Sequence, residues 1–391
     1  MDYCTQLLSR LVSMDTDSET KKGYGECANF IAEEARKLRL KPKIVFAPAP
    51  DKKPRPNVLI EYSIGMDKTV VFAAHYDTVP AGKGWKTDPF KLTRKGGRLF
   101  GRGASDNKGA IAVALSALKK LKQRGKSNVN VKLIFSCDEE VGSEFGLRYL
   151  CEKRKKEIDG DLAIVLDAGS RYIGIGCSAA VLGKIFIKGE QGHAGYPHKA
   201  RNVLNSVIPF LNDLKDYSKE REKVLSKLDA QPGSPKKKVW GRFNITMLNA
   251  GVKENVFPPE AMVGFDLRLI PEEDEKKTLD SFKKFVGKLF KKHDLDGRVE
   301  LNSHGGYFVD ERESKIKKAI SLIRKVSGKH VKTAASLGGT DGTFFARAGI
   351  PVLEFGPASK NSNFHGTNEF ILADDLRKGG EFIKKFCENY A

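Results

Sequence analysis

Histidine and carboxylate residues follow four short apolar runs of this 391-residue sequence. The runs are residues 70–74, 131–137, 162–166 and 351–355, and the residues that come after them are His75 with Asp77, Asp138 to Glu140, Asp167, and, beyond a glycine-rich loop, His365. Imidazole and carboxylate groups bind divalent metals and transfer protons near neutral pH. Four such arrangements in one chain are the pattern expected of a metal-dependent hydrolase.

Two of these groups have spacings that suit separate roles. In His75-x-Asp77 the carboxylate can orient an imidazole that binds metal, although a capping aspartate near a histidine is also common. The three adjacent carboxylates of residues 138–140 repel one another unless a cation neutralises them. Adjacent glutamates allow one to bind the metal while the other acts as general base. The competing interpretation of this segment is a solvated acidic loop.

A glycine-rich loop at residues 101–109 opens into an expected helix at residues 109–122. A loop of this kind can bind phosphate at the helix N-terminus. Its spacing matches neither the Walker loop nor the dinucleotide fingerprint, and the acidic Asp106 would repel a phosphate. We therefore expect Asp106 to face a cation.

The elements that must position these residues alternate between strand and helix from residue 69 to residue 167. This alternation predicts an α/β domain with a mostly parallel sheet. Buried parallel strands are continuous apolar runs, and in such sheets ligands bind just beyond the carboxyl ends of the strands. The four runs therefore predict a functional site at that edge of the sheet.

The pattern changes after residue 167. Period-two alternation predicts half-buried antiparallel strands, and longer periodic segments predict helices. The expected strands are residues 184–188, 243–248 and 261–269, and the expected helices are residues 202–217 and 273–292. These elements indicate a small α+β domain at residues 179–299, inserted between residues 1–178 and 300–391 of the first domain.

The composition predicts a globular chain of two domains, with 40% hydrophobic and 30% charged residues. Its net charge of +20 comes from scattered basic clusters without interleaved aromatics, so we expect solvated surfaces or attraction of anionic substrates, and no nucleic-acid partner. No apolar stretch approaches the roughly 20 residues that span a bilayer, and no secretory signal is visible. The six scattered cysteines fit neither a disulfide framework nor a thiolate metal site, which favours the cytoplasm.

Five motifs, taken together, resemble those of the co-catalytic zinc metallopeptidases. They are His-x-Asp-Thr-Val-Pro from His75, Gly-Arg-Gly-x-x-Asp-x-Lys-Gly from Gly101, Asp-Glu-Glu from Asp138, the later Asp167 and the final His365. Their order and spacing extend the resemblance from about residue 2 to residue 376. The family includes aminoacylases, acetylornithine deacetylases, succinyl-diaminopimelate desuccinylases, carboxypeptidases and dipeptidases, and it implies a zinc-peptidase-like sheet with a ferredoxin-like lid domain.

The resemblance implies two zinc ions per subunit, for which cobalt or manganese could substitute. The implied ligands are His75 and Asp167 on one metal, Glu140 and His365 on the other, and Asp106 as a bridge between them. Asp77 would hold the His75 ring, and Glu139 would be the general base toward a metal-activated water. The peptide bond between Asp106 and Asn107 is expected to be cis.

The inserted domain also carries residues that the resemblance marks. Residues 191–202 are similar to the lid motif of the desuccinylases and deacetylases, which implies a homodimer in which His193 reaches the active site of the other subunit and stabilises the oxyanion. Asn255 and Arg268 match lid positions that contact substrate. Gly339 and Thr340 lie in a loop, residues 338–342, that matches a substrate-side loop, although an ordinary glycine-rich turn is the alternative.

The resemblance implies hydrolysis of a small-molecule substrate, and we favour an N-acyl amino acid over a dipeptide or a C-terminal peptide bond. The lid motif around His193 is deacylase-like. Two features point the other way: residues 176–180 lack the Arg-Arg-Gly-Ser segment of the desuccinylases, and Asp167 stands where deacylases usually have glutamate. A non-catalytic binding module is disfavoured because such a relative would lack some ligands or the base.

Overall fold

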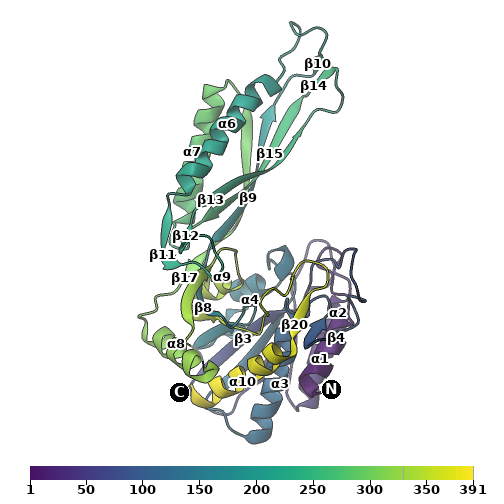
Figure 1. The fold of residues 1–391 in the computed structure, drawn as a ribbon, viewed down its shortest axis with the longest axis vertical. Coiled ribbons are helices and arrows are strands. Elements are labelled where there is room, and N and C mark those ends of the chain that lie inside the picture. Colours follow the sequence, from purple (N-terminus) through teal and green to yellow (C-terminus); the bar gives the residue numbers. More distant parts are fainter. Residues whose placement is uncertain (329, 391) are drawn as a thin grey trace. The chain divides into compact units, whose positions relative to one another are not determined.

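The computed structural model describes residues 1–328 and 330–390 and divides into two compact units (Figure 1). The first unit comprises Met1–Ile175, Val309–Thr333 and Asp341–Ala391. The second unit comprises Gly176–Phe308 and Ala334–Thr340. The second unit is therefore an insertion in the chain of the first.

A mixed sheet forms the centre of the first unit. Its strands, in spatial order, are β1 (Lys43–Phe46), β2 (Pro56–Tyr62), β6 (Asn130–Ser136), β3 (Thr69–His75), β7 (Leu162–Val165), β19 (Val352–Glu354) and β8 (Tyr172–Cys177), and β8 also pairs with β17 (Tyr307–Phe308) and β18 (Lys332–Ser336). The four strands from β6 to β19 are parallel, and the pairs at either side of them are antiparallel. The predicted α/β fold with a mostly parallel central sheet is confirmed.

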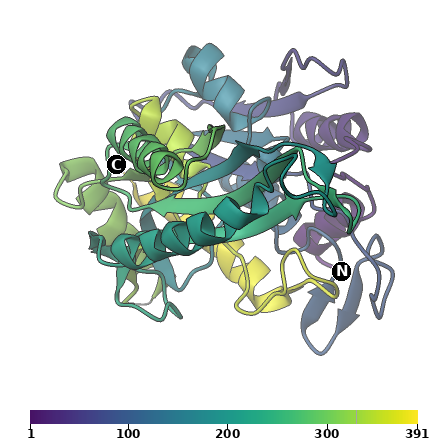
Figure 2. The ribbon, with the colours of Figure 1, turned by 90° about the horizontal axis from the view of Figure 1, so that it is seen from above.

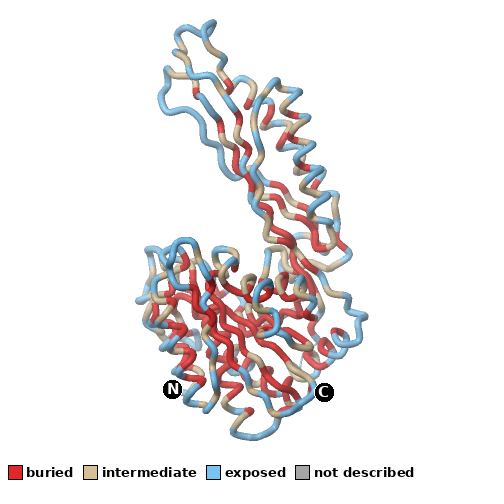
Figure 3. Tube along the Cα trace, turned by 180° about the vertical axis from the view of Figure 1, so that it is seen from behind, coloured by how far each residue is buried: buried red, intermediate tan, exposed pale blue. Residues whose placement is uncertain are grey.

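The register of the parallel strands brings together the strand ends that precede the candidate site residues. His75, the last residue of β3, pairs with Ser136, the last residue of β6. Val165 at the end of β7 pairs with Ala73 of β3 and with Glu354 of β19. The strands are buried along their length, as the red central band of Figure 3 shows. The loops that follow β3, β6 and β7 therefore leave the sheet at one edge.

Helices pack against this sheet (Figure 1). They are α1 (Tyr3–Val12), α2 (Tyr24–Lys37), α3 (Lys108–Arg124), α4 (Leu147–Lys153), α5 (Lys155–Ile158), α8 (Ser314–Ser327), α9 (Gly342–Arg347) and α10 (Ala373–Asn389). The predicted helix at residues 109–122 is α3, which packs against α1 and α10 and is almost entirely buried. It ends at Gly125, whose φ of 61° is in the left-handed region that glycine favours.

A smaller antiparallel sheet of three strands also belongs to the first unit. Its order is β20 (Phe370–Leu372), β5 (Arg98–Phe100) and β4 (Thr93–Lys95). Because β5 directly precedes the glycine-rich loop and β20 follows His365, this sheet connects the chain segments that carry Asp106 and His365.

The second unit contains a four-stranded antiparallel sheet with two helices on one face (Figures 1 and 2). The strands are, in order, β13 (Arg242–Ala250), β15 (Glu260–Leu269), β9 (Ala179–Lys188) and β16 (Gly297–His304), and the helices are α6 (Leu204–Arg221) and α7 (Glu275–Lys292). The unit also contains two small two-stranded antiparallel sheets: β10 (Gly192–His193) with β14 (Val256–Phe257), and β11 (Leu225–Asp229) with β12 (Lys238–Trp240).

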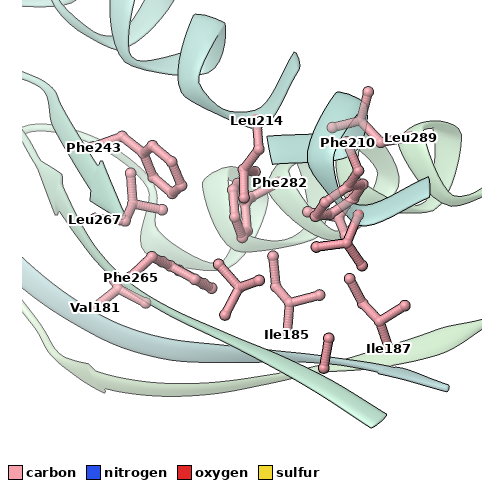
Figure 4. Packing of buried hydrophobic residues seen from close by; sticks show 14 of the residues in the cluster. Val181, Ile185, Ile187, Phe210, Leu214, Phe243, Phe265, Leu267, Phe282 and Leu289 are labelled. Atoms are coloured by element: carbon pink, nitrogen blue, oxygen red, sulfur yellow. The ribbon is translucent and has the colours of Figure 1, made fainter. Parts of the chain in front are cut away.

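The helices hold to the sheet through an aromatic and aliphatic core (Figure 4). Phe210 of α6 and Phe282 of α7 are fully buried, and the Phe282 ring lies 5.0 Å from that of Phe265 on β15. Val181 and Ile185 of β9 point into the same core. Every second side chain of these strands points into this core, which explains the period-two pattern of the sequence.

Among the strands of the four-stranded sheet, β16 is the one that the sequence pattern did not predict. Only Val299 and Leu301 give it an alternating apolar pattern, and its other residues are mostly charged or polar. The unit also continues past the predicted boundary at residue 299, to Phe308. Within the described part of the chain, no helix has both the length and the apolar composition that crossing a membrane requires.

Candidate metal centre and active site

Two groups of potential metal ligands lie at the sheet edge of the first unit. The first group consists of His75 at the end of β3, Asp167 just after β7, and Asp106 in the loop before α3. His75 Nε2 is 3.1 Å from Asp106 Oδ1 and 3.7 Å from Asp167 Oδ2. One nitrogen and two carboxylate oxygens thus face a common point.

The second group shares Asp106 with the first. Its other members are Glu140, which follows β6, and His365, in the loop before β20. His365 Nε2 is 3.1 Å from Asp106 Oδ2 and 2.9 Å from Glu140 Oε2. Because each oxygen of Asp106 faces a different imidazole, this carboxylate can bridge two metal ions.

The electrostatics of the cluster favour cations. Burial, followed by the nearby carboxylates, raises the pKa of Glu139, Glu140 and Asp167 above the ordinary values. Burial also acts to raise the pKa of Asp106, but hydrogen bonds from the two imidazoles lower it below its usual range. Crowded, buried carboxylates of this kind are stabilised as anions by bound cations. The oxygen and nitrogen ligands fit zinc, cobalt or manganese.

Asp77 connects His75 to the glutamate pair. The main-chain oxygen of Asp77 is 3.1 Å from His75 Nδ1, and its carboxylate is 3.5 Å from the same atom. Both carboxylate oxygens accept main-chain N–H groups, from Glu139 at 3.2 Å and from Glu140 at 3.1 Å. Asp77 therefore orients the imidazole and also fixes the turn that presents the two glutamates.

Glu139 lies beside His75 of the first ligand group. It begins the single 3-10 turn Glu139–Val141, and its Oε2 is 3.9 Å from His75 Nε2. Burial raises its pKa well above that of an ordinary glutamate, with Asp341 among the contributing carboxylates. Asp341 accepts a hydrogen bond of 2.6 Å from Ser143 Oγ, and burial raises its own pKa to about 6. The sequence motif at residues 338–342 contains Asp341 but gives no signal for this contact.

Asp138, the first acid of the Asp-Glu-Glu motif, faces away from the metal ligands. It is buried and accepts hydrogen bonds from Arg55 Nε at 2.6 Å and from the Tyr24 hydroxyl at 2.9 Å, with Lys21 Nζ at 3.1 Å. Its φ of 61° turns the chain sharply before Glu139. The motif contains Asp138, but its partners are distant in the sequence, so the sequence carried no signal for this anchor.

A second buried acid, Glu369, holds the loop that carries Asp106. Glu369 accepts main-chain N–H groups from Gly103 at 2.9 Å, Ser105 at 2.8 Å and Asp106 at 3.0 Å. It also receives a hydrogen bond of 2.7 Å from Arg102 Nη1, and both side chains are buried. Sequence reasoning did not identify this residue.

Arg102 also donates hydrogen bonds to the loops that carry the other candidate ligands. Its Nη2 donates to the main-chain oxygens of His365 at 3.3 Å and Gly366 at 3.1 Å. It also donates to Pro80 and Ala81, which follow the His75 motif. The Glu369–Arg102 pair therefore joins the loops that carry three of the expected ligands.

Asn107 and Lys108 complete the loop before α3. The Asp106–Asn107 peptide bond is cis, as expected. Asn107 Nδ2 donates a hydrogen bond of 3.0 Å to Asp167 Oδ1, which orients that carboxylate. The buried Lys108 donates to the main-chain oxygen of Met14 at 2.7 Å, beyond the end of α1.

The five lid and loop residues named from the sequence all belong to the second unit, where they form two groups. The first group lies at the paired strands β10 and β14: His193 is on β10, and the main-chain oxygen of Asn255 accepts the N–H of Ala194 at 2.9 Å. His193 is exposed, and its Nδ1 accepts the N–H of Gly195 at 3.0 Å.

The second group lies at the opposite end of the sheet. Arg268 pairs with Ala180 of β9, and Gly339 and Thr340 follow Leu337, whose oxygen accepts a hydrogen bond from Arg242 at 2.9 Å. The nitrogens Nε and Nη2 of Arg268 both donate to Asp266, each at 2.8 Å.

The length of β9 separates the two groups. Its residues 180–188 pair with Arg268 at one end and with Glu260 at the other. A strand advances about 3.3 Å per residue, so this stretch spans roughly 26 Å. His193 lies beyond Lys188 in the chain, so the two groups of one chain cannot both contact one small substrate.

Comparison with known protein families gives a match over most of the chain. The model of "Peptidase family M20/M25/M40" matches residues 71–389. A succinyl-diaminopimelate desuccinylase of Nautilia profundicola is 30% identical over 347 residues, which cover 85% of this chain and 87% of that protein. An uncharacterized metallohydrolase of Methanocaldococcus jannaschii is 30% identical over 346 residues, covering 84% and 82%.

Solved structures share the fold at lower identity. An M20 family metallo-carboxypeptidase of Sulfolobus solfataricus matches with a TM-score of 0.81 at 24% identity, covering 100% of this chain and 99% of that chain. Human carnosine dipeptidase 1 matches with a TM-score of 0.74 at 19% identity, covering 98% and 96%.

Proposed function

The chain belongs to peptidase family M20/M25/M40 and is a metal-dependent hydrolase, and from this premise we propose that it cleaves the amide bond of a small N-acyl amino acid at a centre of two zinc ions. The observation that carries the proposal is the position of Asp106, whose two oxygens each lie 3.1 Å from a different imidazole. A metallo-dipeptidase or carboxypeptidase activity is the alternative.

Two ligand sets would hold the metals. His75 and Asp167 would bind one ion, Glu140 and His365 the other, and Asp106 both. Metal ions bound there would polarise the amide carbonyl and make a water molecule more acidic. Asp77 and Asn107 would keep the ligands oriented through the hydrogen bonds already described.

Glu139 would move the proton. A general base works best when its pKa is near the working pH, and burial raises the pKa of Glu139 in that direction. Glu139 would accept a proton from the attacking water and then deliver it to the nitrogen of the leaving amine. An imidazole N–H of His193 would donate to the oxygen of the amide as negative charge develops there.

The distance within the second unit supports a homodimer. Because His193 is about a strand length from Arg268, we propose that the partner subunit's His193 completes each site. Strand β13 supports this arrangement, since it is an edge strand and its residues 246–250 are exposed on both faces. Unpaired edges with exposed apolar side chains commonly pair with another chain.

The proposal also includes the substrate class, an N-acyl amino acid, and the cellular location, the cytoplasm. A desuccinylase is among the similar relatives, which supports an N-acyl amino acid. The lid motif around His193 agrees with this choice. None of the six cysteines, each of them in the described part of the chain, forms a disulfide, which supports a reducing cytoplasm.

A substrate panel tests the reaction. The zinc- or cobalt-loaded protein should hydrolyse N-acetylornithine, N-succinyl-diaminopimelate or another N-acyl amino acid faster than simple dipeptides. Faster cleavage of dipeptides would favour the alternative, and no hydrolysis of either class would refute the proposal.

Replacement of the base tests the mechanism. Glu139→Ala should retain both metals but lose turnover by a factor on the order of 10²–10⁴. Glu144→Gln is a matched control, since Glu144 is an exposed acid in the same loop and should leave turnover unchanged. Normal activity in Glu139→Ala would exclude Glu139 as the base.

A further inference from the structure

The three-stranded sheet of the first unit carries two adjacent cations on one face. Lys95 of β4 pairs directly with Arg98 of β5 across a turn of Gly96 and Gly97, whose φ angles of 56° and 77° suit a two-residue hairpin. Side chains in directly opposite positions lie on the same face of a sheet, and like charges there repel each other. The pair therefore favours an anion nearby.

No carboxylate of the described residues supplies that negative charge. Within residues 1–328 and 330–390, neither Lys95 nor Arg98 has an acidic group within ion-pair distance. The segment of residues 83–98 holds six basic residues and one acid, Asp88, whose carboxylate accepts the main-chain N–H of Phe90. Five of the 20 net positive charges of the chain therefore lie in this segment.

Lys95 and Arg98 border a pocket of about 580 Å³, a volume within the range of about 300–1,000 Å³ that small-molecule sites occupy. Phe100 and Phe370 line it on the same sheet, and Lys86 lines it from the preceding loop. The Arg98 guanidinium lies over the Phe370 ring, 4.6 Å from the centroid, and that ring is 5.6 Å from the Phe100 ring. A guanidinium stacked on a ring keeps its edge N–H groups for an anion.

The wall of the pocket also holds a donor that the protein does not use. Thr87 Oγ1 is buried and has no hydrogen-bond partner among the described residues. Next to it, the main-chain N–H of Lys86 donates to Asn368 Oδ1 at 2.7 Å, which ties the loop of Lys86 to the segment that follows His365. None of the candidate metal ligands lines the pocket, so it is a site separate from the metal centre.

We propose that this pocket binds a small organic phosphate, such as a nucleoside diphosphate, as a second ligand of the protein. The three cations Lys86, Lys95 and Arg98 exceed the charge of one carboxylate, whereas a phosphate group carries about −1.5 to −2. Its oxygens would accept charged hydrogen bonds from these side chains, and the apolar part of the ligand would pack on Phe100. The proposal concerns binding alone and does not depend on the hydrolase function.

Calorimetric titration of the metal-loaded protein with ADP tests the site. The wild type should bind ADP, whereas adenosine, which lacks the charge, should not bind detectably. Pyrophosphate should bind more weakly than ADP because it lacks a group that packs on Phe100. Arg98→Met should weaken ADP binding by a factor on the order of 10 to 100, and Lys95→Met should act in the same direction. Both side chains are exposed, so metal content and Tm should not change.

Arg10→Met is the matched control. Arg10 is an exposed arginine of α1 in the same unit, and it lies over the Phe30 ring, 5.9 Å from the centroid. Like Arg98, it has no acidic partner within the part of the chain that the structure describes. Its replacement removes the same charge from the same kind of stacked side chain and should leave the affinity for ADP unchanged.

Five results would overturn the proposal. The first is a wild type that does not bind ADP. The second is an equal loss of affinity in Arg10→Met, which would mean that only the net charge attracts ADP. ADP binding that Arg98→Met leaves unchanged would indicate that the phosphates bind the metal ions instead. Pyrophosphate binding as tight as that of ADP would exclude an organic ligand, and a short single-stranded oligonucleotide that binds far more tightly than ADP would indicate a nucleic-acid surface.

Discussion

At the scale of the residue, the candidate metal centre is held by buried groups that lie outside the two ligand sets. Asp106 faces both imidazoles, but its position is set by Glu369, which accepts its main-chain N–H, and by Arg102, which pairs with Glu369. Charged hydrogen bonds of this kind are stronger than neutral ones. Glu369 and Arg102 are therefore positioning residues for the metal centre.

Glu369→Gln should weaken metal binding and lower stability together. The substitution keeps the size of the side chain but leaves the buried Arg102 without a carboxylate, and breaking such a pair costs about 3–5 kcal/mol. We expect metal affinity to fall by roughly 10- to 100-fold, because the Asp106 loop is no longer held. Metal titrations and denaturant unfolding would measure the two effects.

Glu381→Gln serves as the comparison for that experiment. Glu381 pairs with Lys120 and Lys384 in a partly exposed position, where an ion pair contributes about 0–1 kcal/mol. If the two variants bind metal equally well, Glu369 does not position the metal ligands.

Metal binding should release protons. Hydrogen bonds to Asp106 and then Glu140 raise the pKa of His365 to about 10 in the metal-free protein, above the ordinary histidine value of 6.5. The stability that the charged ring adds to the metal-free protein is thus fully present below about pH 6.5 and is lost as pH rises through 10. A metal needs the neutral ring, so metal affinity changes in the opposite sense and increases with pH.

Calorimetric zinc titrations at pH 8, in two buffers with different ionisation enthalpies, would count the protons. We expect at least one proton to leave per protein, and His198→Asn, which changes an exposed histidine of the second unit, to leave that number unchanged. A binding heat that does not depend on the buffer would contradict the expectation.

At the scale of the element, the N-terminal segment fixes the turn that carries the proposed general base. The first residue of α2, Tyr24, and Arg55, just before β2, both contact Asp138, which directly precedes the turn Glu139–Val141. On its other side the turn is held by the carboxylate of Asp77. The proposed general base, Glu139, is thus positioned by elements far from it in the sequence.

Tyr24→Phe tests this anchoring. The loss of one hydrogen bond to a buried carboxylate should lower the free energy of unfolding by about 1.5–3 kcal/mol and reduce kcat more than it raises KM. Tyr3→Phe is the control, because the Tyr3 hydroxyl donates to Glu34 at the same 2.9 Å, between α1 and α2 and away from the catalytic turn. A fall in kcat that is as large for Tyr3→Phe would mean that the effect is general destabilisation.

At the scale of the whole molecule, the proposed site requires two chains. The second unit offers the edge strand β13, on which Met247 and Leu248 are 47% and 53% exposed. Those exposures are high for apolar residues of a folded strand, and a second copy pairing along this edge would cover them. Assembly and activity would then be coupled, since His193 would act in the partner's site.

Leu248→Lys should separate the subunits and reduce turnover together. A charge on the paired edge disfavours association. We expect the sedimentation coefficient to fall to that of a monomer and turnover to fall with it, while both metals stay bound. Leu225→Lys, which changes an exposed leucine of β11, should keep the dimer and its activity. A Leu248→Lys dimer, or an active monomer, would contradict the arrangement.

The sequence by itself determined the reaction class and the main features of the fold. Parallel strands are continuous apolar runs, and their ends meet at one sheet edge for geometric reasons. His75, Glu140 and Asp167, each near a strand end, could therefore be assigned together. The inserted strands were recognisable by their alternation, apart from the weakly patterned β16.

Only the tertiary structure decided which residues hold and complete the site. Glu369 is 264 residues from Ser105, and Arg55 is 83 residues from Asp138, so no local pattern reports these contacts. A local pattern reports burial and period, whereas the partners of a buried charge depend on which chain segments meet.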